Sequence, residues 1–386
     1  MAHDPHPFDA LLLVSFGGPD KPDDVVAFLE NVTRGRGIPH GRLAEVGEHY
    51  FQLGGRSPIN DQCRELLAAI RADFVAEGID VPVYWGNRNW DPYLADTIQQ
   101  MADDGVERAA CFVTSAYSSY SGCRQYRENL FDAVEAIEHG DAVEAIEHGD
   151  AVEAVDGTSP RLDKLRHYFN HDGFVAPFVD GTVAALDEID ADVRDSARLV
   201  FVAHSIPTAM NDASGASGGS LGGAYVRQHA DVAMTVATRV RDLTGVDRDF
   251  DLVYCSRSGP PQMPWLEPDI NDHLLALSGE GTDAVIVIPI GFVSDHMEVI
   301  FDLDIQAAQT AGSLDMAFSR AATPGIDPRF VAMVRDLLLE RAARERGDRA
   351  VHPAKVGGLS ASHDVCPAGC CANPRGPRPA LCGRDA

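Results

Sequence analysis

The chain carries six short runs of Val, Ile, Leu, Ala and Phe, separated by segments with helical spacing. Apolar runs of this length without polar alternation are typical of strands buried on both faces of a parallel sheet. We therefore expect an α/β protein. The predicted strands are Ala10–Ser15, Val81–Gly86, Ala109–Ser115, Leu199–Ala203, Asp251–Cys255 and Ala284–Pro289, and the predicted helices include Val25–Val32, Asp61–Glu77, Asp91–Asp104, Ala224–Leu243 and Pro328–Glu345.

The predicted strands divide three and three around a long helical and acidic interval, at about residues 126 to 198. This division predicts two doubly wound halves, residues 8–170 and 171–346, each with its own core. Parallel sheets of this kind bind ligands at the carboxyl ends of their strands, so we expect a central cleft there.

Composition excludes several classes of function. The net charge of -27 disfavours binding to nucleic acid or to an anionic membrane surface. No apolar run reaches the roughly 18 residues that a membrane span needs, and residues 1–9 lack the basic and apolar regions of a secretory signal. We expect a cytoplasmic protein.

Residues 132–157 repeat DAVEAIEHG twice and then DAVEAVDG, with nine acidic residues and no Lys or Arg. We interpret this repeat as an inserted surface segment, partly helical and interrupted by Gly140, Gly149 and Gly157. His139 and His148 could bind a metal weakly, but a solvated acidic face is favoured. The Gly/Ser-rich stretch 213–223 is predicted to be a mobile loop.

Three carboxylates follow the last predicted strand. Asp295, Glu298 and Asp302 are spaced by three and four residues, which predicts one row on a helical face. Such oxygen ligands suit a hard or borderline divalent cation. The alternative is an acidic first turn that complements the helix dipole, which accounts for Asp295 and Glu298 but not for Asp302.

His204 ends the buried run LVFVA, where its side chain would point into the cleft. With an ordinary pKa near 6.5, a histidine there can take up protons or bind a metal. A histidine in this position is more often structural, so the functional interpretation needs support from elsewhere in the chain. The clustered tyrosines of TSAYSSYSGCRQYR offer flat faces for a planar ligand, or ordinary packing.

Six motifs together resemble the ferrochelatase family over about residues 8 to 345. They are LLLVSFGGP, GGRSPIN, SAYSSYSGCRQYREN, FVAHSIP, MPWLEP and GFVSDHMEVIFDLDI, in that order. The resemblance implies two flavodoxin-like halves around a porphyrin, with His204 and Glu298 facing each other across the macrocycle. It also implies that Ser57 and Tyr126 line the porphyrin site.

Metalation of a porphyrin needs a base for two pyrrole protons, a route for the cation and a site that distorts the ring. His204 would ligate the iron or take up the protons, and Glu298 with Asp302 and Asp295 would form the metal path. Cations must also bind the porphyrin carboxylates. The candidates are Arg34, Arg36 and Arg56, with Arg124 or Arg127 behind them.

The stretch 32–47, which corresponds to the lip of the porphyrin site, is polar and basic. A polar lip favours coproporphyrin III, with four carboxylates, as the acceptor of Fe²⁺, and protoporphyrin IX is the alternative. Insertion of cobalt or nickel into another tetrapyrrole is a second enzymatic alternative. A haem-binding or redox-sensing iron–sulfur protein is an alternative of a different class.

Residues 347–386 form a proline-rich tail with four cysteines and almost no apolar periodicity, so something other than a core must order it. Clustered thiolates bind zinc or an iron–sulfur cluster. Some ferrochelatases hold a 2Fe–2S cluster with one internal and three C-terminal cysteines. The resemblance implies Cys123, Cys366, Cys371 and Cys382 as ligands, with Cys370 as a possible replacement.

Overall fold

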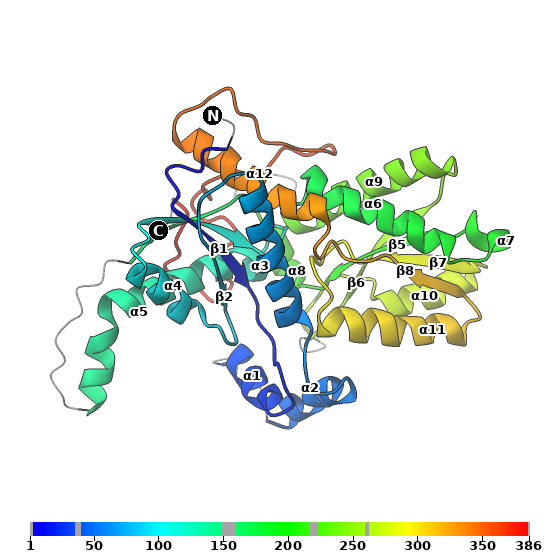
Figure 1. The fold of residues 1–386 in the computed structure, drawn as a ribbon. Coiled ribbons are helices and arrows are strands. Elements are labelled where there is room, and N and C mark those ends of the chain that lie inside the picture. The colour runs from blue at the N-terminus through cyan, green and yellow to red at the C-terminus, as the bar shows by residue number, and fades with distance from the viewer. Residues whose placement is uncertain (1–2, 35–39, 149–158, 217–222, 259–261, 385–386) are drawn as a thin grey trace.

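The computed structural model describes residues 3–34, 40–148, 159–216, 223–258 and 262–384. They form two four-stranded parallel sheets (Figure 1). The first has the order β2-β1-β3-β4 and the second has the equivalent order β6-β5-β7-β8. The predicted α/β class and parallel sheets are confirmed. The strands are β1 (Ala10–Ser15), β2 (Val83–Asn87), β3 (Arg108–Val113), β4 (Arg161–Lys164), β5 (Arg198–His204), β6 (Phe250–Cys255), β7 (Ala284–Ile288) and β8 (Ala317–Arg320).

Sequence reasoning missed β4 and β8, one of the two outer strands of each sheet. Their sequences, RLDK and AFSR, are four residues long and contain charged side chains. Neither segment has a continuous apolar run, so neither carried the pattern that identified the other six.

The predicted helices are all present, with small shifts at their ends. Ala224–Leu243 is observed as α9 (Ala224–Thr244), for example, and Pro328–Glu345 as α12 with unchanged bounds. The remaining helices are α1 (Asp24–Val32), α2 (His40–Gln52), α3 (Ile59–Ala76), α4 (Leu94–Asp103), α5 (Gln125–His148), α6 (Asp172–Asp187), α7 (Ala191–Arg194), α8 (Thr208–Asp212), α10 (Ile270–Gly279) and α11 (Ala308–Ser313), with π-helices η1 (Tyr120–Arg124) and η2 (Val299–Ala307).

The expectation of two separate cores is only partly right. Alternate residues of β5 face opposite layers: Val200 and Val202 pack with α10, η2 and α11, whereas Leu199 and Phe201 face α6 and α9. The second of these layers continues into the first sheet, where Leu13 and Phe112 belong to the same cluster. Helix α12 packs against both α6 and α3, so it joins the two halves across the proposed boundary.

The acidic repeat and the Gly/Ser-rich stretch predicted from the sequence are only partly among the described residues. Helix α5 runs through Gly140 to His148, so Gly140 does not interrupt it. The rest of the acidic repeat, at 149–158, and most of the Gly/Ser-rich stretch, at 217–222, lie outside the described residues. Among the described helices, none combines the length and apolar character that a membrane crossing requires.

Candidate functional site

His204 is the last residue of β5, and its main chain is fixed on both sides. The Tyr225 hydroxyl donates a hydrogen bond to the His204 carbonyl, in the peptide unit that joins His204 to Ser205, at 2.8 Å. The N–H of the same unit donates to the Cys255 carbonyl, also at 2.8 Å. The strand is buried up to Ala203 and becomes partly exposed at His204. The imidazole therefore emerges from a rigid strand end.

Gly291 brings the segment after β7 against this strand end. Its N–H donates to the Val202 carbonyl at 3.0 Å. A Cβ atom at position 291 would lie 2.7 Å from Ala203 Cα, closer than packed atoms can lie, so this position requires glycine. The chain then continues to Glu298, which precedes η2. A π-helix is rare and occurs frequently at functional sites.

The structure brings His204 and Glu298 together. His204 Nε2 lies 3.6 Å from Glu298 Oε2, and their side chains are about one third and one half exposed, respectively (33% and 50%). His204 Nδ1 lies 2.5 Å from the Ser205 carbonyl oxygen. Because a carbonyl only accepts, Nδ1 carries a hydrogen, and Nε2 is the nitrogen that faces the carboxylate.

The two groups shift each other's pKa in opposite directions. Burial alone would lower the pKa of His204, but the Glu298 carboxylate raises it above its ordinary value through its charge and a hydrogen bond, with support from Ser205 and Asp302. Burial alone would raise the pKa of Glu298, whereas His204, with His296, lowers it to about 2. The arrangement favours an imidazolium–carboxylate pair when no metal is bound.

Asp302 lies in the same environment, within η2. Its carboxylate accepts a hydrogen bond from the Ser256 hydroxyl, and Ser256 follows β6 with a left-handed φ of 62°. Burial raises the pKa of Asp302 to about 6, with the Glu298 charge adding to this effect. A carboxyl group with this pKa can release or take up a proton near neutrality.

Asp295 does not share the predicted helical face, because it precedes the helix. Its carboxylate pairs with Arg320 at 3.2 Å and accepts a hydrogen bond from the Thr323 hydroxyl at 3.1 Å. Only Glu298 and Asp302 of the three therefore belong to the helical segment, while Asp295 is held by Arg320 at the end of β8 and by Thr323 in the loop that follows.

Helices of the first half contact this segment directly. The Gln62 side chain donates to the Asp295 carbonyl at 2.7 Å. The His49 ring stacks on Phe301 with centroids 3.9 Å apart. Burial, with a contribution from the Glu298 charge, raises the pKa of Tyr50. Helices α2 and α3 thus meet the region around Glu298.

The residues predicted to line the porphyrin site differ in their exposure to solvent. Ser57 and Tyr126 are buried, and the Arg88 guanidinium lies over the Tyr126 ring at 4.4 Å from its centroid. Arg34 and Arg56 are exposed, and Arg56 pairs with Asp61. Arg36 lies outside the described residues.

Arg124 and Arg127 contact the C-terminal tail and do not lie on an exposed surface. Both are buried. Arg124 pairs with Glu128 at 3.2 Å and donates to the Arg378 carbonyl, while Arg127 donates to the Leu381 carbonyl at 2.6 Å. Both arginines thus donate to main-chain carbonyls of the returning tail.

Four buried cysteines form one cluster: Cys123 of η1 with Cys366, Cys370 and Cys371 of the tail. Cys123 is hydrogen-bonded to Cys366 and Cys371. The Cys370 and Cys371 sulfurs lie 3.9 Å apart. Hydrogen bonds from Cys123 and Cys370 hold the pKa of Cys366 well below its ordinary value. We call these four residues the cysteine ring.

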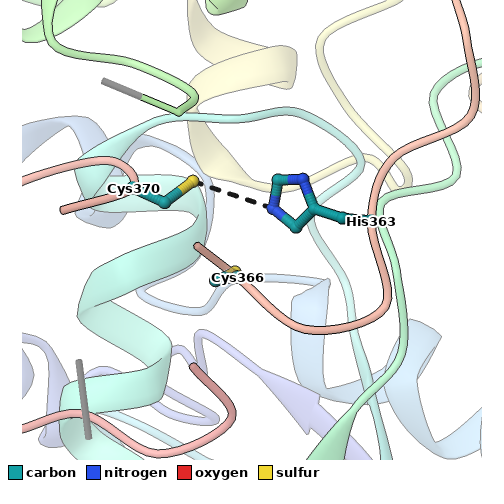
Figure 2. Close-up of side chains that lie close together, drawn as sticks. All are labelled: His363, Cys366 and Cys370. Atoms are coloured by element: carbon teal, nitrogen blue, oxygen red, sulfur yellow. Dashed lines mark hydrogen bonds between the residues drawn. The ribbon is translucent and has the colours of Figure 1, made fainter. Parts of the chain in front are cut away.

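His363 lies beside this ring (Figure 2), with its Nε2 3.8 Å from Cys370 Sγ. The donor atoms of His363, Cys366 and Cys370 all lie within 4.8 Å of one another. A nitrogen donor is thus available at the edge of the sulfur set, on the same stretch of tail.

Cys382, one of the predicted ligands, lies outside the cysteine ring. Its sulfur accepts a hydrogen bond from the Lys164 main-chain N–H and donates to the Leu162 carbonyl, each at 3.1 Å. These bonds attach Cys382 to the free edge of β4. Cys370, named above as the replacement, takes its place in the ring.

Sequence reasoning missed several residues that shape the site. Ser256 and Tyr225 carry no motif of their own and reach His204 or Asp302 only through the fold. His296 lies within the SDHME motif, so its proximity to Glu298 could have been anticipated. Burial lowers the pKa of His296, which favours its neutral form.

The family profile and the similar sequences agree on one family. The profile described as Ferrochelatase matches residues 8–342. The coproporphyrin III ferrochelatase of Streptomyces coelicolor is 58% identical over 99% of this chain and 98% of its own length, and that of Streptomyces griseus is 57% identical over the same shares. Among solved structures, SirB from Bacillus subtilis with Fe³⁺ matches 88% of this chain and 97% of its own at 12% identity, with a TM-score of 0.46.

The proximity of the pair yields a prediction for the metal-free protein. Replacing Glu298 with Gln removes the charge that raises the pKa of His204 and leaves the burial that lowers it. The pKa of His204 should therefore fall below its value in the unchanged protein, so that the imidazole loses its proton at lower pH. NMR titration of the ring resonances measures this, with Glu267→Gln, an exposed carboxylate, as the control. An unchanged or higher His204 pKa in Glu298→Gln would contradict the electrostatic account.

Proposed function

Because this chain belongs to the ferrochelatase family, we propose that it inserts ferrous iron into coproporphyrin III to give Fe-coproporphyrin III in haem biosynthesis. The observation that carries the proposal is the pairing of His204 with Glu298 at 3.6 Å at the end of β5. The full-length similarity to two coproporphyrin III ferrochelatases supports the choice of substrate.

The chemistry proposed for the pair follows from its charges. A porphyrin must lose two N–H protons as its four nitrogens take up the iron, and a neutral imidazole or a carboxylate can accept them. His204 presents Nε2 to the site and Glu298 is ionised across the physiological pH range. In the metal-free pair His204 holds a proton, so we assign the arriving Fe²⁺ the role of displacing that proton to solvent. The neutral imidazole and the Glu298 carboxylate then share the tasks of binding the cation and receiving the pyrrole protons.

Asp302 extends this path. It lies within η2, four residues after Glu298. Its charge helps to raise the pKa of His204, and the Glu298 charge helps to raise the pKa of Asp302 itself. A carboxyl with a pKa of about 6 can hold the arriving cation as a carboxylate and pass a proton outward. Asp295 is assigned a structural role in this path because it pairs with Arg320.

The substrate preference rests on the polar lip. Coproporphyrin III carries four carboxylates, and a charged ligand needs cations that are open to solvent before it binds. Arg34 and Arg56 are exposed in the segments that the family resemblance assigns to the porphyrin site, together with buried Ser57 and Tyr126. A hydrophobic lip would instead favour protoporphyrin IX.

Turnover with the two porphyrins tests the proposal. Purified protein, supplied anaerobically with Fe²⁺, should metalate coproporphyrin III with a kcat/KM at least about tenfold above that for protoporphyrin IX, a difference of about 1.4 kcal/mol. Absorbance of the metalated product measures both reactions in the same detergent and buffer. Equal or better use of protoporphyrin IX would overturn the substrate assignment, and no metalation of either porphyrin would overturn the activity.

We also propose that the cysteine ring holds a 2Fe–2S cluster. Such clusters are bound by four cysteine thiolates, and the four ring residues are buried and within hydrogen-bonding reach of their neighbours in the ring. When bound, the cluster would supply one-electron chemistry and a covalent tie between η1 and the tail. A reducing cytoplasm, our proposed location, would keep these thiols available for it.

Two serine substitutions separate the proposed ligand from its neighbour. Cys370→Ser should remove the visible absorption of protein purified without oxygen, because it removes a sulfur from the ring. Cys382→Ser should keep the absorption, because that thiol bonds to β4 instead. Absorption lost in Cys382→Ser and kept in Cys370→Ser would overturn the ligand assignment. Zinc in the unchanged protein, without visible absorption, would overturn the cluster.

A further inference from the structure

Tyr225 lies on the first turn of α9 and reaches the main chain of the candidate site. Its hydroxyl donates to the His204 carbonyl at 2.8 Å, and its side chain is buried. That carbonyl belongs to the same peptide unit whose N–H is held by Cys255. The next carbonyl, of Ser205, accepts the hydrogen bond from His204 Nδ1. The orientation of the imidazole thus depends on a peptide plane that Tyr225 holds on one side.

The Tyr225 ring is itself held within an aromatic stack. His229, one turn later on α9, is completely buried, and its Nδ1 lies 2.8 Å from the Tyr225 carbonyl. The His229 ring lies 4.3 Å from the ring of Tyr225 and 3.5 Å from that of Tyr117, centroid to centroid. Tyr117 comes from the first half and donates to the Ile290 carbonyl. Rotation of the Tyr225 side chain would have to displace this stack.

The cysteine-rich tail supports the start of the same helix. Cys371 donates its N–H to the Gly215 carbonyl at 3.0 Å, and the Gly215 N–H donates to the Cys371 sulfur at 3.3 Å. The adjacent Ser214 hydroxyl oxygen accepts the Tyr225 N–H at 2.9 Å and donates to Asn211. A short run of hydrogen bonds therefore leads from the cysteine ring to the residue that holds His204.

We propose that Tyr225 is a positioning residue for iron insertion. By holding the peptide unit between residues 204 and 205, it orients His204 Nε2 toward the reacting centre. Tyr225 is in turn held by Cys371 through Gly215 and Ser214. The inference rests on the proposed role of His204. Tyr225 does not act on the substrate itself, because its hydroxyl is committed to the carbonyl. Its contribution is geometric, and small errors of aim at a reacting centre reduce rates steeply.

The chain offers a closely matched control. Tyr168 is also buried, and its hydroxyl donates to the carbonyl of Val113, the last residue of β3, at 3.0 Å. Tyr168→Phe and Tyr225→Phe each remove one hydroxyl from a hydrogen bond to the carbonyl of a strand's last residue. Only in Tyr225→Phe does that carbonyl belong to His204.

The test compares the two variants in the full-length protein with coproporphyrin III and Fe²⁺. We expect Tyr225→Phe to lower kcat on the order of tenfold or more, with the KM for porphyrin within about twofold of the unchanged protein, and Tyr168→Phe to keep kcat. The His204 ring resonances of the metal-free protein should shift in Tyr225→Phe and not in Tyr168→Phe. If Tyr225→Phe does not fold, Ser214→Ala, which removes the brace, should give the same loss confined to kcat.

The outcomes separate this inference from the proposal beneath it. Equal kcat values for the two Tyr→Phe variants, or a loss in Tyr225→Phe that appears in KM alone, would overturn the positioning role of Tyr225. Full activity of His204→Ala in the same assay would instead overturn the role of His204, whatever the tyrosine variants do.

Discussion

The parallel pairing of β5 with β7 is the constraint on which the candidate site depends. Arg198 to Phe201 lie beside Val285 to Ile288, so the two strands end at the same edge of the sheet. Gly291 then packs on Ala203 at a distance that excludes any side chain. Because of this contact, the segment after β7 passes directly over the end of β5, and Glu298 reaches His204. Neither residue would meet the other through local structure, since they are 94 positions apart.

The pair also shows why burial and charge must be considered together. Burial alone would leave His204 neutral and would favour protonation of Glu298, yet their mutual attraction outweighs burial for both groups. For Asp302, burial and the Glu298 charge outweigh the attraction of His204, and its pKa rises instead. Two carboxylates on one short helical segment thus acquire different protonation behaviour, which suits a path along which a divalent cation enters and protons leave.

Much of the fold could be predicted from the sequence because its strong signals are local. Runs such as LLLV and AVIVI allow few interpretations, and α12 has its predicted bounds. What could not be predicted was mostly non-local. The outer strands β4 and β8 lack apolar runs, the central core is shared because α12 packs on both halves, and Asp295 bonds to Arg320 rather than joining a helical face. Tyr225 and Ser256 became visible only once the fold had placed them.

The cysteine-rich tail shows a different limit of prediction from sequence. Its cysteine spacing indicated a metal centre, but spacing does not tell which thiols converge. The structure places Cys370 in the cysteine ring and Cys382 outside it. The physical reason is that Cys382 makes hydrogen bonds at the open edge of β4, whereas Cys370 and Cys371 are buried beside Cys123 and Cys366. Buried arginines of η1 and α5 then hold the rest of the tail by its carbonyls.

The most direct test of the central claim, that His204 and Glu298 act as one unit in metalation, is a double-mutant cycle on kcat for coproporphyrin III. His204→Ala, Glu298→Gln and the double variant would be compared with the unchanged protein, with porphyrin binding measured in parallel. The account predicts that each single substitution lowers kcat by about 10²-fold or more and that the double variant is little worse than either. Losses that multiply in the double variant, or a single variant with full activity, would contradict it.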